Sequence, residues 1–218
     1  MRLKFLNFII LFLIPTIFTG GCKGRTGGED QDNNIPVSAA NRERTDSVTG
    51  TDEYIIGSDE SDEQLLREAA MEGNAVRVEQ LVSGNTDVNS SLPDGRTALM
   101  LAAYNGHTAV MDLLMNAGAE VEMKDEHDRT ALMYASTGHF PNAVKLLLEN
   151  GADPNVIDKE EKFSPLMFAA AEGHFEVVKI LLENDADATL KDKDGDTAES
   201  FARINGHERV AELLSRYK

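Results

Sequence analysis

The sequence of 218 residues contains no tryptophan and a single cysteine, and its aromatic residues are nine Phe and four Tyr. With one cysteine the chain cannot form an internal disulfide, so a packed core has to hold any fold together. Basic residues are also scarce: 21 Lys and Arg stand against 38 Asp and Glu, for a formal net charge of -17. So acidic a chain repels phosphate backbones, which excludes nucleic acid as a partner. Hydrophobic residues still make up 41%, which is enough for a core.

The sequence has no apolar run long enough to span a bilayer as a helix. Its longest run, residues 5–18, covers 14 residues, whereas a spanning helix needs about 20. Arg2 and Lys4 precede this run, and the small residues 19–21 follow it. Because basic, apolar and small residues follow one another in this order in secretory signals, we predict a signal peptide over residues 1–21.

The only cysteine, Cys22, comes directly after Gly20 and Gly21. The segment resembles the signal of bacterial lipoproteins, although Thr19 stands where that motif usually has an aliphatic residue. The resemblance implies cleavage before Cys22, lipidation of Cys22 and anchoring in the cell envelope. Since Lys23 is not Asp, the same resemblance favours the outer over the inner membrane. The alternative is cleavage at a nearby bond, which would leave a soluble periplasmic or secreted protein with a free thiol.

Residues 22–60 are rich in Gly, Ser, Thr, Asn and Asp, and their few apolar residues follow no helical period. Such a composition cannot bury enough apolar surface to offset the entropy that is lost on ordering. We therefore predict a flexible linker that holds the domain of residues 61–218 away from the membrane.

Within that domain the sequence repeats at spacings of 33, 34 and 33 residues. The recurring features are a Thr or Ser marker, a pair of small residues, a Gly-His step and a run of Leu or Ile. The Thr or Ser can cap a helix N-terminus, the Gly permits a turn between two helices, and the Leu run supplies a buried helix face. The markers lie at Thr97, Thr130, Ser164 and Thr197.

This pattern resembles the ankyrin repeat, and the resemblance covers about residues 62–218. It implies an all-α solenoid of helix-turn-helix units joined by β-hairpin loops, in which stacking covers the apolar faces that one unit leaves open. About five units fit, with polar residues at both ends as terminal caps require: residues 62–90, 91–123, 124–157, 158–190 and 191–218.

Three departures from the family pattern lead to structural predictions. The family's His in the Thr-Pro-Leu-His signature is replaced by Met, which predicts apolar packing at that place. Gly138 and His139 are displaced by one position relative to the other Gly-His steps, which predicts a shorter first helix in the third unit. The spacing of 34 residues before Ser164 predicts a longer loop over residues 158–162.

No arrangement typical of a catalytic or metal site emerges from the sequence. His107, His174 and His207 recur with the repeat, so we interpret them as helix-start residues. The acidic residues in the segment 192–199 evoke a calcium loop, but Gly195 does not follow the third acidic position as that loop requires. We interpret this segment as an acidic loop tip and expect no metal, no cofactor and no catalytic activity.

The resemblance implies instead a binding surface along the loop tips and the exposed side of the first helices, which form a concave groove. Since successive units stack at helix-packing distance, Arg96, Arg129 and Phe163 are expected to form a stripe beside Tyr104. Arginine and aromatic residues are enriched where interfaces gain most of their binding energy. The predicted partner-binding residues are Arg96, Tyr104, Asn105, His127, Arg129, Phe163 and Glu172.

A less specific interpretation of the same positions stays open. Arg96 would then pair with Asp94, and Arg129 with Asp128, as solvated salt bridges that contribute little. His127 would be an ordinary solvated loop residue.

We therefore expect a monomeric, noncatalytic protein-interaction module in a bacterial cell envelope, which scaffolds or inhibits an exported protein. A basic protein or an exported enzyme would suit the chain's charge, because opposite charges speed association. The alternatives are a structural envelope component that binds a polymer or the membrane, and an enzyme with an unrecognised site.

Overall fold

The computed structural model of the chain describes residues 61–217. The predicted signal peptide of residues 1–21, the cysteine at position 22 and the predicted linker of residues 22–60 lie outside the described residues. The structure is therefore informative about the repeat region, and the predictions for the preceding segment stay predictions.

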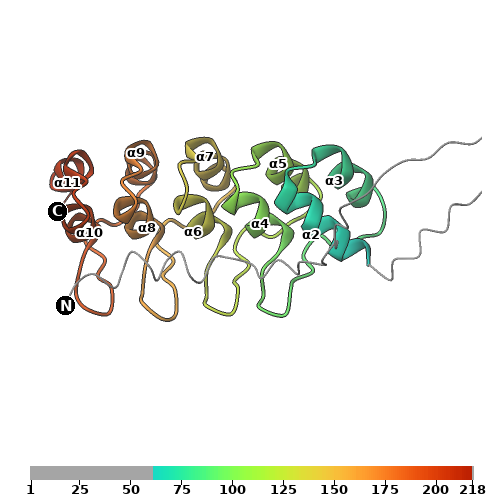
Figure 1. Cartoon of the computed structure of the whole chain (residues 1–218), viewed down its shortest axis with the longest axis horizontal. Coiled ribbons are helices and arrows are strands. Elements are labelled where there is room, and N and C mark those ends of the chain that lie inside the picture. The colour runs from blue at the N-terminus through green and yellow to red at the C-terminus, as the bar shows by residue number, and fades with distance from the viewer. Residues whose placement is uncertain (1–60, 218) are drawn as a thin grey trace, which may run out of the picture. The chain divides into compact units, whose positions relative to one another are not determined.

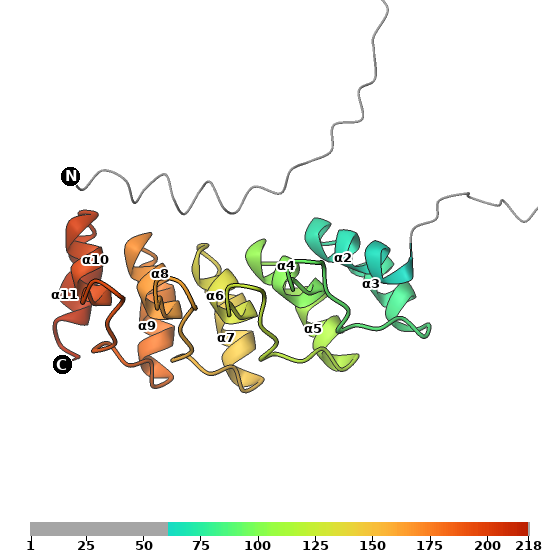
Figure 2. The ribbon, with the colours of Figure 1, turned by 90° about the horizontal axis from the view of Figure 1, so that it is seen from below.

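Residues 61–217 form ten helices, arranged as five helix-turn-helix pairs that stack side by side (Figure 1). We call the first helix of each pair the inner helix and the second the outer helix. Inner helices pack against the inner helices of neighbouring pairs, and outer helices pack against outer helices (Figure 2). Within residues 61–217 no helix has the length and apolar character needed to cross a membrane. The inner helices are α2 (Asp62–Glu72), α4 (Ala98–Tyr104), α6 (Ala131–Ser136), α8 (Pro165–Ala171) and α10 (Ala198–Ile204). The outer helices are α3 (Ala75–Val82), α5 (Thr108–Asn116), α7 (Pro141–Glu149), α9 (Phe175–Glu183) and α11 (Glu208–Leu214).

The inner helices begin where the Thr and Ser markers predict. The side chains of Thr97, Ser164 and Thr197 each accept a hydrogen bond from a backbone N–H three residues later, which satisfies a donor that the helix itself leaves open. Thr130 stands at the same place before α6 but makes no side-chain cap bond. Three outer helices have a histidine as the N-cap residue at their start, as predicted: His107, His174 and His207.

The core lies between the two helix layers. The small-residue pairs of the inner helices are fully buried, which lets neighbouring inner helices approach closely. The methionines that replace the family's His are buried as well, so the predicted apolar packing is confirmed: Met100, Met133 and Met167. The expected all-α solenoid is thus the observed fold.

The turn inside the third pair is irregular in the predicted way. The helix α6 has six residues, whereas α4 and α8 have seven each. Gly106 turns the chain of the second pair with a φ of +70°, a conformation that favours glycine. Phe140, not His139, is the N-cap residue that precedes the outer helix α7. A phenyl ring therefore takes the place that histidine has in the second, fourth and fifth pairs.

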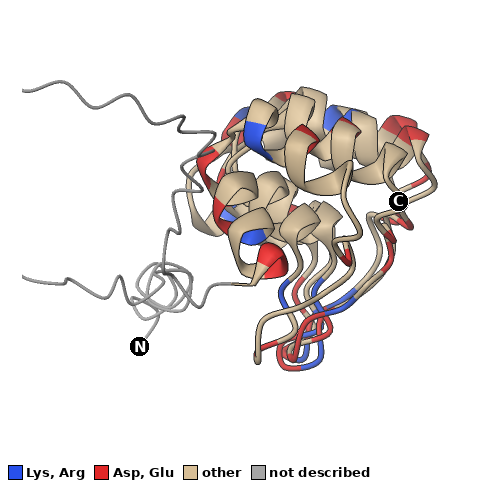
Figure 3. Cartoon of the chain, turned by 90° about the vertical axis from the view of Figure 1, so that its right-hand side faces the viewer, with Lys and Arg blue, Asp and Glu red and all other residues tan. Residues whose placement is uncertain are grey.

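The connections between pairs are loops that project together from one side of the helices (Figures 1 and 3). The loop of residues 125–129 is closed by a bond from the backbone N–H of Asp125 to the carbonyl of Arg129, 3.1 Å long. In the next loop the closing bond runs from the backbone N–H of Asp158 to the carbonyl of Phe163. This bond spans five residues along the chain instead of four, so the longer loop is confirmed. Instead of the β-hairpin strands that the resemblance implied, the described residues contain one isolated bridge, between Ser91 and Thr97.

Candidate functional site

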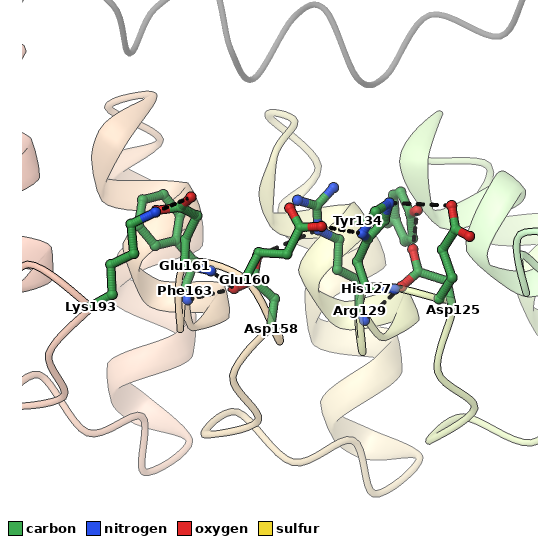
Figure 4. A network of polar contacts seen from close by, with 10 residues as sticks. Asp125, His127, Arg129, Tyr134, Asp158, Glu160, Glu161, Phe163 and Lys193 are labelled. Atoms are coloured by element: carbon green, nitrogen blue, oxygen red, sulfur yellow. Dashed lines mark hydrogen bonds and ion pairs between the residues drawn. The ribbon is translucent and has the colours of Figure 1, made fainter.

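Backbone hydrogen bonds join the tips of the four loops into one surface, which we call the tip ladder. Figure 4 shows polar contacts of residues on the last three of these loops. Each loop after the first donates one backbone N–H to a carbonyl of the loop before it. Because these bonds fix neighbouring loops to one another, the tips form one continuous element and not four separate ones. The three bonds run from Glu126 to Asp94 (2.9 Å), from Lys159 to His127 (2.9 Å) and from Lys193 to Glu161 (3.0 Å).

A buried aspartate organises each of the last three loops. Asp125, Asp158 and Asp192 are 6%, 2% and 7% exposed, and each accepts backbone N–H bonds from its own loop. A buried carboxylate is stable only when such donors satisfy it. The sequence analysis missed this role, although an Asp recurs five or six residues before each later marker and Leu92 takes that place in the first loop.

Asp125 also links its loop to the inner helix α6. Its carboxylate accepts bonds from the backbone N–H groups of His127 (2.9 Å) and Arg129 (2.8 Å) and from the hydroxyl of Tyr134 (2.7 Å). Burial and the adjacent carboxylate of Asp125 together raise the pKa of Tyr134. The phenol therefore acts as a fixed donor that holds the loop on the helix.

Arg96 forms the salt bridge that the less specific interpretation predicted. Its guanidinium nitrogens lie 2.7 Å and 2.8 Å from Oδ2 of Asp94. Burial alone would raise the pKa of Asp94, but the hydrogen bonds from Arg96 hold this pKa below its usual value. Both side chains are partly accessible, so the pair is a feature of the loop surface.

Arg129 does not pair with the neighbouring Asp128, and the interpretation that it does is wrong. Its Nε lies 3.5 Å from Oδ2 of the buried Asp158, and its guanidinium carbon lies 5.9 Å from the ring centre of Phe168. A charge from the second loop thus compensates a buried carboxylate in the third. Arg129 ties two units together and remains only partly exposed.

Phe163 does not belong to an exposed stripe, because its side chain is only 4% exposed. Its ring packs edge-on against the rings of Phe168 (5.4 Å between centroids) and Phe201 (4.9 Å). Burial of a phenyl ring among other rings is more favourable than its exposure at a loop tip. The predicted stripe is therefore interrupted at this position.

His127 lies at the tip of its loop, as predicted, and contacts carboxylates on both sides. Its ring nitrogens lie 3.4 Å from Glu126 and 3.0 Å from Glu160 of the next loop. Its carbonyl also accepts the bond from the backbone N–H of Lys159, so His127 is part of the tip ladder. Basic and acidic residues both occur along these loops (Figure 3).

Three other predicted residues lie at the ends of the inner helices, away from the tips. Tyr104 ends α4 and its ring meets Tyr134 edge-on, with 6.3 Å between centroids. The amide of Asn105 donates to the carbonyls of Met71 (3.1 Å) and Leu101 (3.2 Å), so it has a structural task. Glu172 is exposed. The predicted residues therefore fall into a loop group and a helix-end group, with the buried Phe163 in neither.

Within residues 61–217 no group of three or more His, Cys, Asp or Glu side chains is arranged to hold a metal ion. The acidic segment around Asp192 is a loop of the tip ladder, in which the carboxylate of Asp192 accepts the backbone N–H groups of Asp194 and Asp196. The arrangement offers a recognition surface of charged and polar groups.

A family model for ankyrin repeats (3 copies) matches residues 66–158 and 140–218. No curated protein matches the chain. The matched residues contain the helix pairs and loops described above, apart from the first turn of α2. The chain belongs to the ankyrin-repeat family, whose members are in general noncatalytic modules of protein–protein interaction.

Proposed function

We propose that this protein is a lipoprotein of a bacterial envelope, anchored through Cys22 in the outer membrane, whose ankyrin domain binds an exported protein without catalysing a reaction. Binding either scaffolds that protein or inhibits it. The order of basic, apolar and small residues before Cys22 supports export and anchoring. The repeat region supports the binding role.

The observation that carries the binding role is the tip ladder. Its three bonds between loops run along the whole row of loops, so a partner meets a surface whose parts are already ordered. A preordered surface loses less entropy on binding than loops that must first be fixed. The ladder therefore suits a large, folded protein partner.

The charges of the tips favour a basic partner. The loops of residues 92–96, 125–129, 158–163 and 192–196 contain ten acidic and five basic residues. Opposite charges steer two proteins together, and salt screens this attraction. Association with the partner should therefore slow as salt increases; an association rate that is constant from low to high salt would contradict a basic partner.

Site-specific photo-crosslinking in the living bacterium tests the proposal. A photoreactive residue at position 127 of the full chain lies on the tip ladder, and one at position 145 lies on the exposed side of α7 as the matched control. We expect one exported protein to be captured from position 127 and not from position 145. Capture of the same set from both positions, or of no protein, would overturn the binding role.

The anchor is tested in the same cells. The Cys22→Ser variant should move from the membrane fraction to the soluble fraction, and mass spectrometry of the native protein should find a lipidated N-terminal cysteine. An unmodified Cys22 would show that the protein is not a lipoprotein.

The activity of the captured protein distinguishes scaffolding from inhibition. An inhibited partner loses its activity in proportion to the amount of ankyrin protein added, whereas a scaffolded partner keeps its activity.

A further inference from the structure

The sequence contains three asparagines that are followed directly by glycine: Asn105, Asn150 and Asn205. An asparagine in this dipeptide readily loses its side-chain amide, because glycine has no Cβ to hinder attack by its own backbone nitrogen on the asparagine side chain. Since the three sites share the same dipeptide, a difference in their reactivity has to come from the fold.

The local backbone is alike at the three sites. Each asparagine is the C-cap residue of a helix, and the φ of the glycine that follows lies between +70° and +87°. The glycine N–H donates to the carbonyl three residues before it, over 3.0 to 3.2 Å. The nitrogen that would attack is therefore held by the helix end, and the reaction requires the last turn to open.

Two of the asparagines are also bonded to the preceding unit. The side-chain amide of Asn105 donates to the carbonyl of Met71 at 3.1 Å, and that of Asn205 donates to the carbonyl of Ala171 at 2.7 Å. Opening of either helix end therefore breaks a link between two units in addition to the turn itself. Such an opening is rarer than the fraying of a helix end alone.

Asn150 is bonded within its own helix instead, where its amide donates to the carbonyl of Leu146 at 2.8 Å. The end of α7 can therefore open without breaking a bond from this amide to another unit.

The end of α7 is also accessible to water. Asn150 and Gly151 are both exposed, and a methyl group placed on Gly151 would meet nothing within 4 Å. A methyl group on Gly106 would lie 2.3 Å from a ring carbon of Phe140, whereas Gly206 is as open as Gly151. Asn105 is thus protected by packing and by its bond to Met71, and Asn205 by its bond to the preceding unit.

We propose that Asn150 is a site of spontaneous deamidation in the folded protein, and that Asn105 and Asn205 are protected by the fold. The backbone nitrogen of Gly151 attacks Cγ of Asn150 and gives up its proton. The side-chain nitrogen takes up this proton and leaves as ammonia, so that a five-membered succinimide ring forms. One water molecule then opens the ring and leaves either aspartate or isoaspartate.

Both products change the end of α7. An ionised carboxylate has no donor, so the bond to the carbonyl of Leu146 is lost. The new negative charge lies at a helix C-terminus, which already carries a partial negative charge. Isoaspartate also adds one carbon to the main chain, in the connection between the third and fourth units.

Ageing of the full chain tests this proposal. The folded protein is kept in neutral buffer, a second sample is kept unfolded in urea, and mass spectrometry of peptides measures deamidation at each asparagine over time. In urea the three Asn-Gly sites should react at similar rates. In the folded protein Asn150 should react about fivefold or more faster than Asn105 and Asn205, because opening at those two sites also separates two units.

Asn184 provides a matched control in the same chain. It is the C-cap residue of α9, it is exposed, and its amide donates to the carbonyl of Ile180 at 2.8 Å. Asp185 follows it with a φ of +63°, a conformation that favours glycine, but its side chain hinders the attack. Asn184 should therefore react slowly in the unmodified chain, and in Asp185→Gly it should react about as fast as Asn150.

The comparisons within one chain separate the effect of the dipeptide from the effect of the fold. The proposal is overturned if Asn105 or Asn205 reacts as fast as Asn150 in the folded protein, or if Asn150 stays unmodified in buffer while it reacts in urea. It is also overturned if Asn184 remains unreactive in folded Asp185→Gly, because an exposed Asn-Gly site at a helix end would then be protected without a bond from its amide to another unit.

Discussion

The junction between the last two units and the junction between the second and third are built differently. At the last junction, His207 and Asn205 both donate to the carbonyl of Ala171, at 3.0 Å and 2.7 Å. At the other, the ring of Phe140 lies on two glycines and the carbonyl of Tyr104 has no such donor. One junction is held by polar links and the other by an aromatic contact.

The loops above these two junctions are alike. A backbone bond of 2.9 Å joins Glu126 to Asp94 at the aromatic junction, and one of 3.0 Å joins Lys193 to Glu161 at the polar one. The tip ladder is thus constant where the helix ends vary. Because the loops and the core keep the units in register, the residues at the helix ends can change without loss of the stack.

Gly106→Ala should break the aromatic junction. The new methyl group would meet the Phe140 ring at 2.3 Å in a residue with a φ of +70°, so overpacking and backbone strain add to a loss of about 3 kcal/mol in the free energy of unfolding. Gly206→Ala is the matched control: its φ is +79° and nothing lies within 4 Å of the new methyl, so strain alone should cost about 1 kcal/mol. Urea denaturation of both variants measures the difference, and equal losses would mean that the Phe140 contact is not tight.

The loops can be compared through their buried aspartates. Asp125→Ala should cost about 2 kcal/mol, because two backbone donors and the Tyr134 hydroxyl lose their acceptor. Asp192→Ala removes an acceptor from two backbone groups only and should cost about 1 kcal/mol. Thermal unfolding provides the measurement. If Asp192→Ala proved the more destabilising variant, the link from Asp125 to the helix would contribute nothing.

The fold could be predicted from the sequence because its signals are local and repeat. The markers and glycines recur at nearly constant spacing, and the helix caps at Thr97, Ser164 and Thr197 are formed within their own units. The spacing of 34 residues was enough to locate the longer loop, and the displaced Gly138 was enough to predict that α6 is short.

The candidate site could be predicted only in part, because burial and pairing depend on neighbouring units. Phe163 occupies the register of Arg96 and Arg129, but rings of two inner helices enclose it. Arg129 pairs with Asp158, which lies 29 positions away in the next loop. Asp125 carries a charge that favours exposure, and only the folded loop supplies the donors that allow its burial.

The threonines that precede α4 and α6, on either side of the aromatic junction, should respond differently to the loss of their hydroxyl groups. Thr97→Val removes the acceptor for the Met100 N–H and should cost about 1 kcal/mol of unfolding free energy. The hydroxyl of Thr130 is buried and has no hydrogen-bond partner, so Thr130→Val should leave the stability unchanged or raise it by up to about 1 kcal/mol. Chemical denaturation measures the change in the free energy of unfolding of both variants. An equal loss in both variants would show that Thr130 does cap α6 in solution.

The smallest effect is expected from acid at the junction between the third and fourth units, where His174 stands in the place that Phe140 has one unit earlier. Burial lowers the pKa of His174, and the neighbouring His139 adds to this effect. As the pH falls, the unfolded chain takes up a proton near pH 6.5, before the folded chain does. The stabilising contribution of His174 is therefore complete above that pH and is lost as the pH falls below it.

The urea concentration at the midpoint of unfolding should decrease when the pH is lowered from about 8 to about 5.5, and it should decrease less in His174→Phe. His139→Ala should show an intermediate dependence. Hydrogen exchange is compared as protection factors, which correct for the intrinsic pH dependence of amide exchange. Since Phe140 cannot titrate, the protection factors at the start of α7 should stay constant over this range, while those at the start of α9 should decrease toward low pH. A parallel change at both helix starts would mean that His174 does not set the acid response.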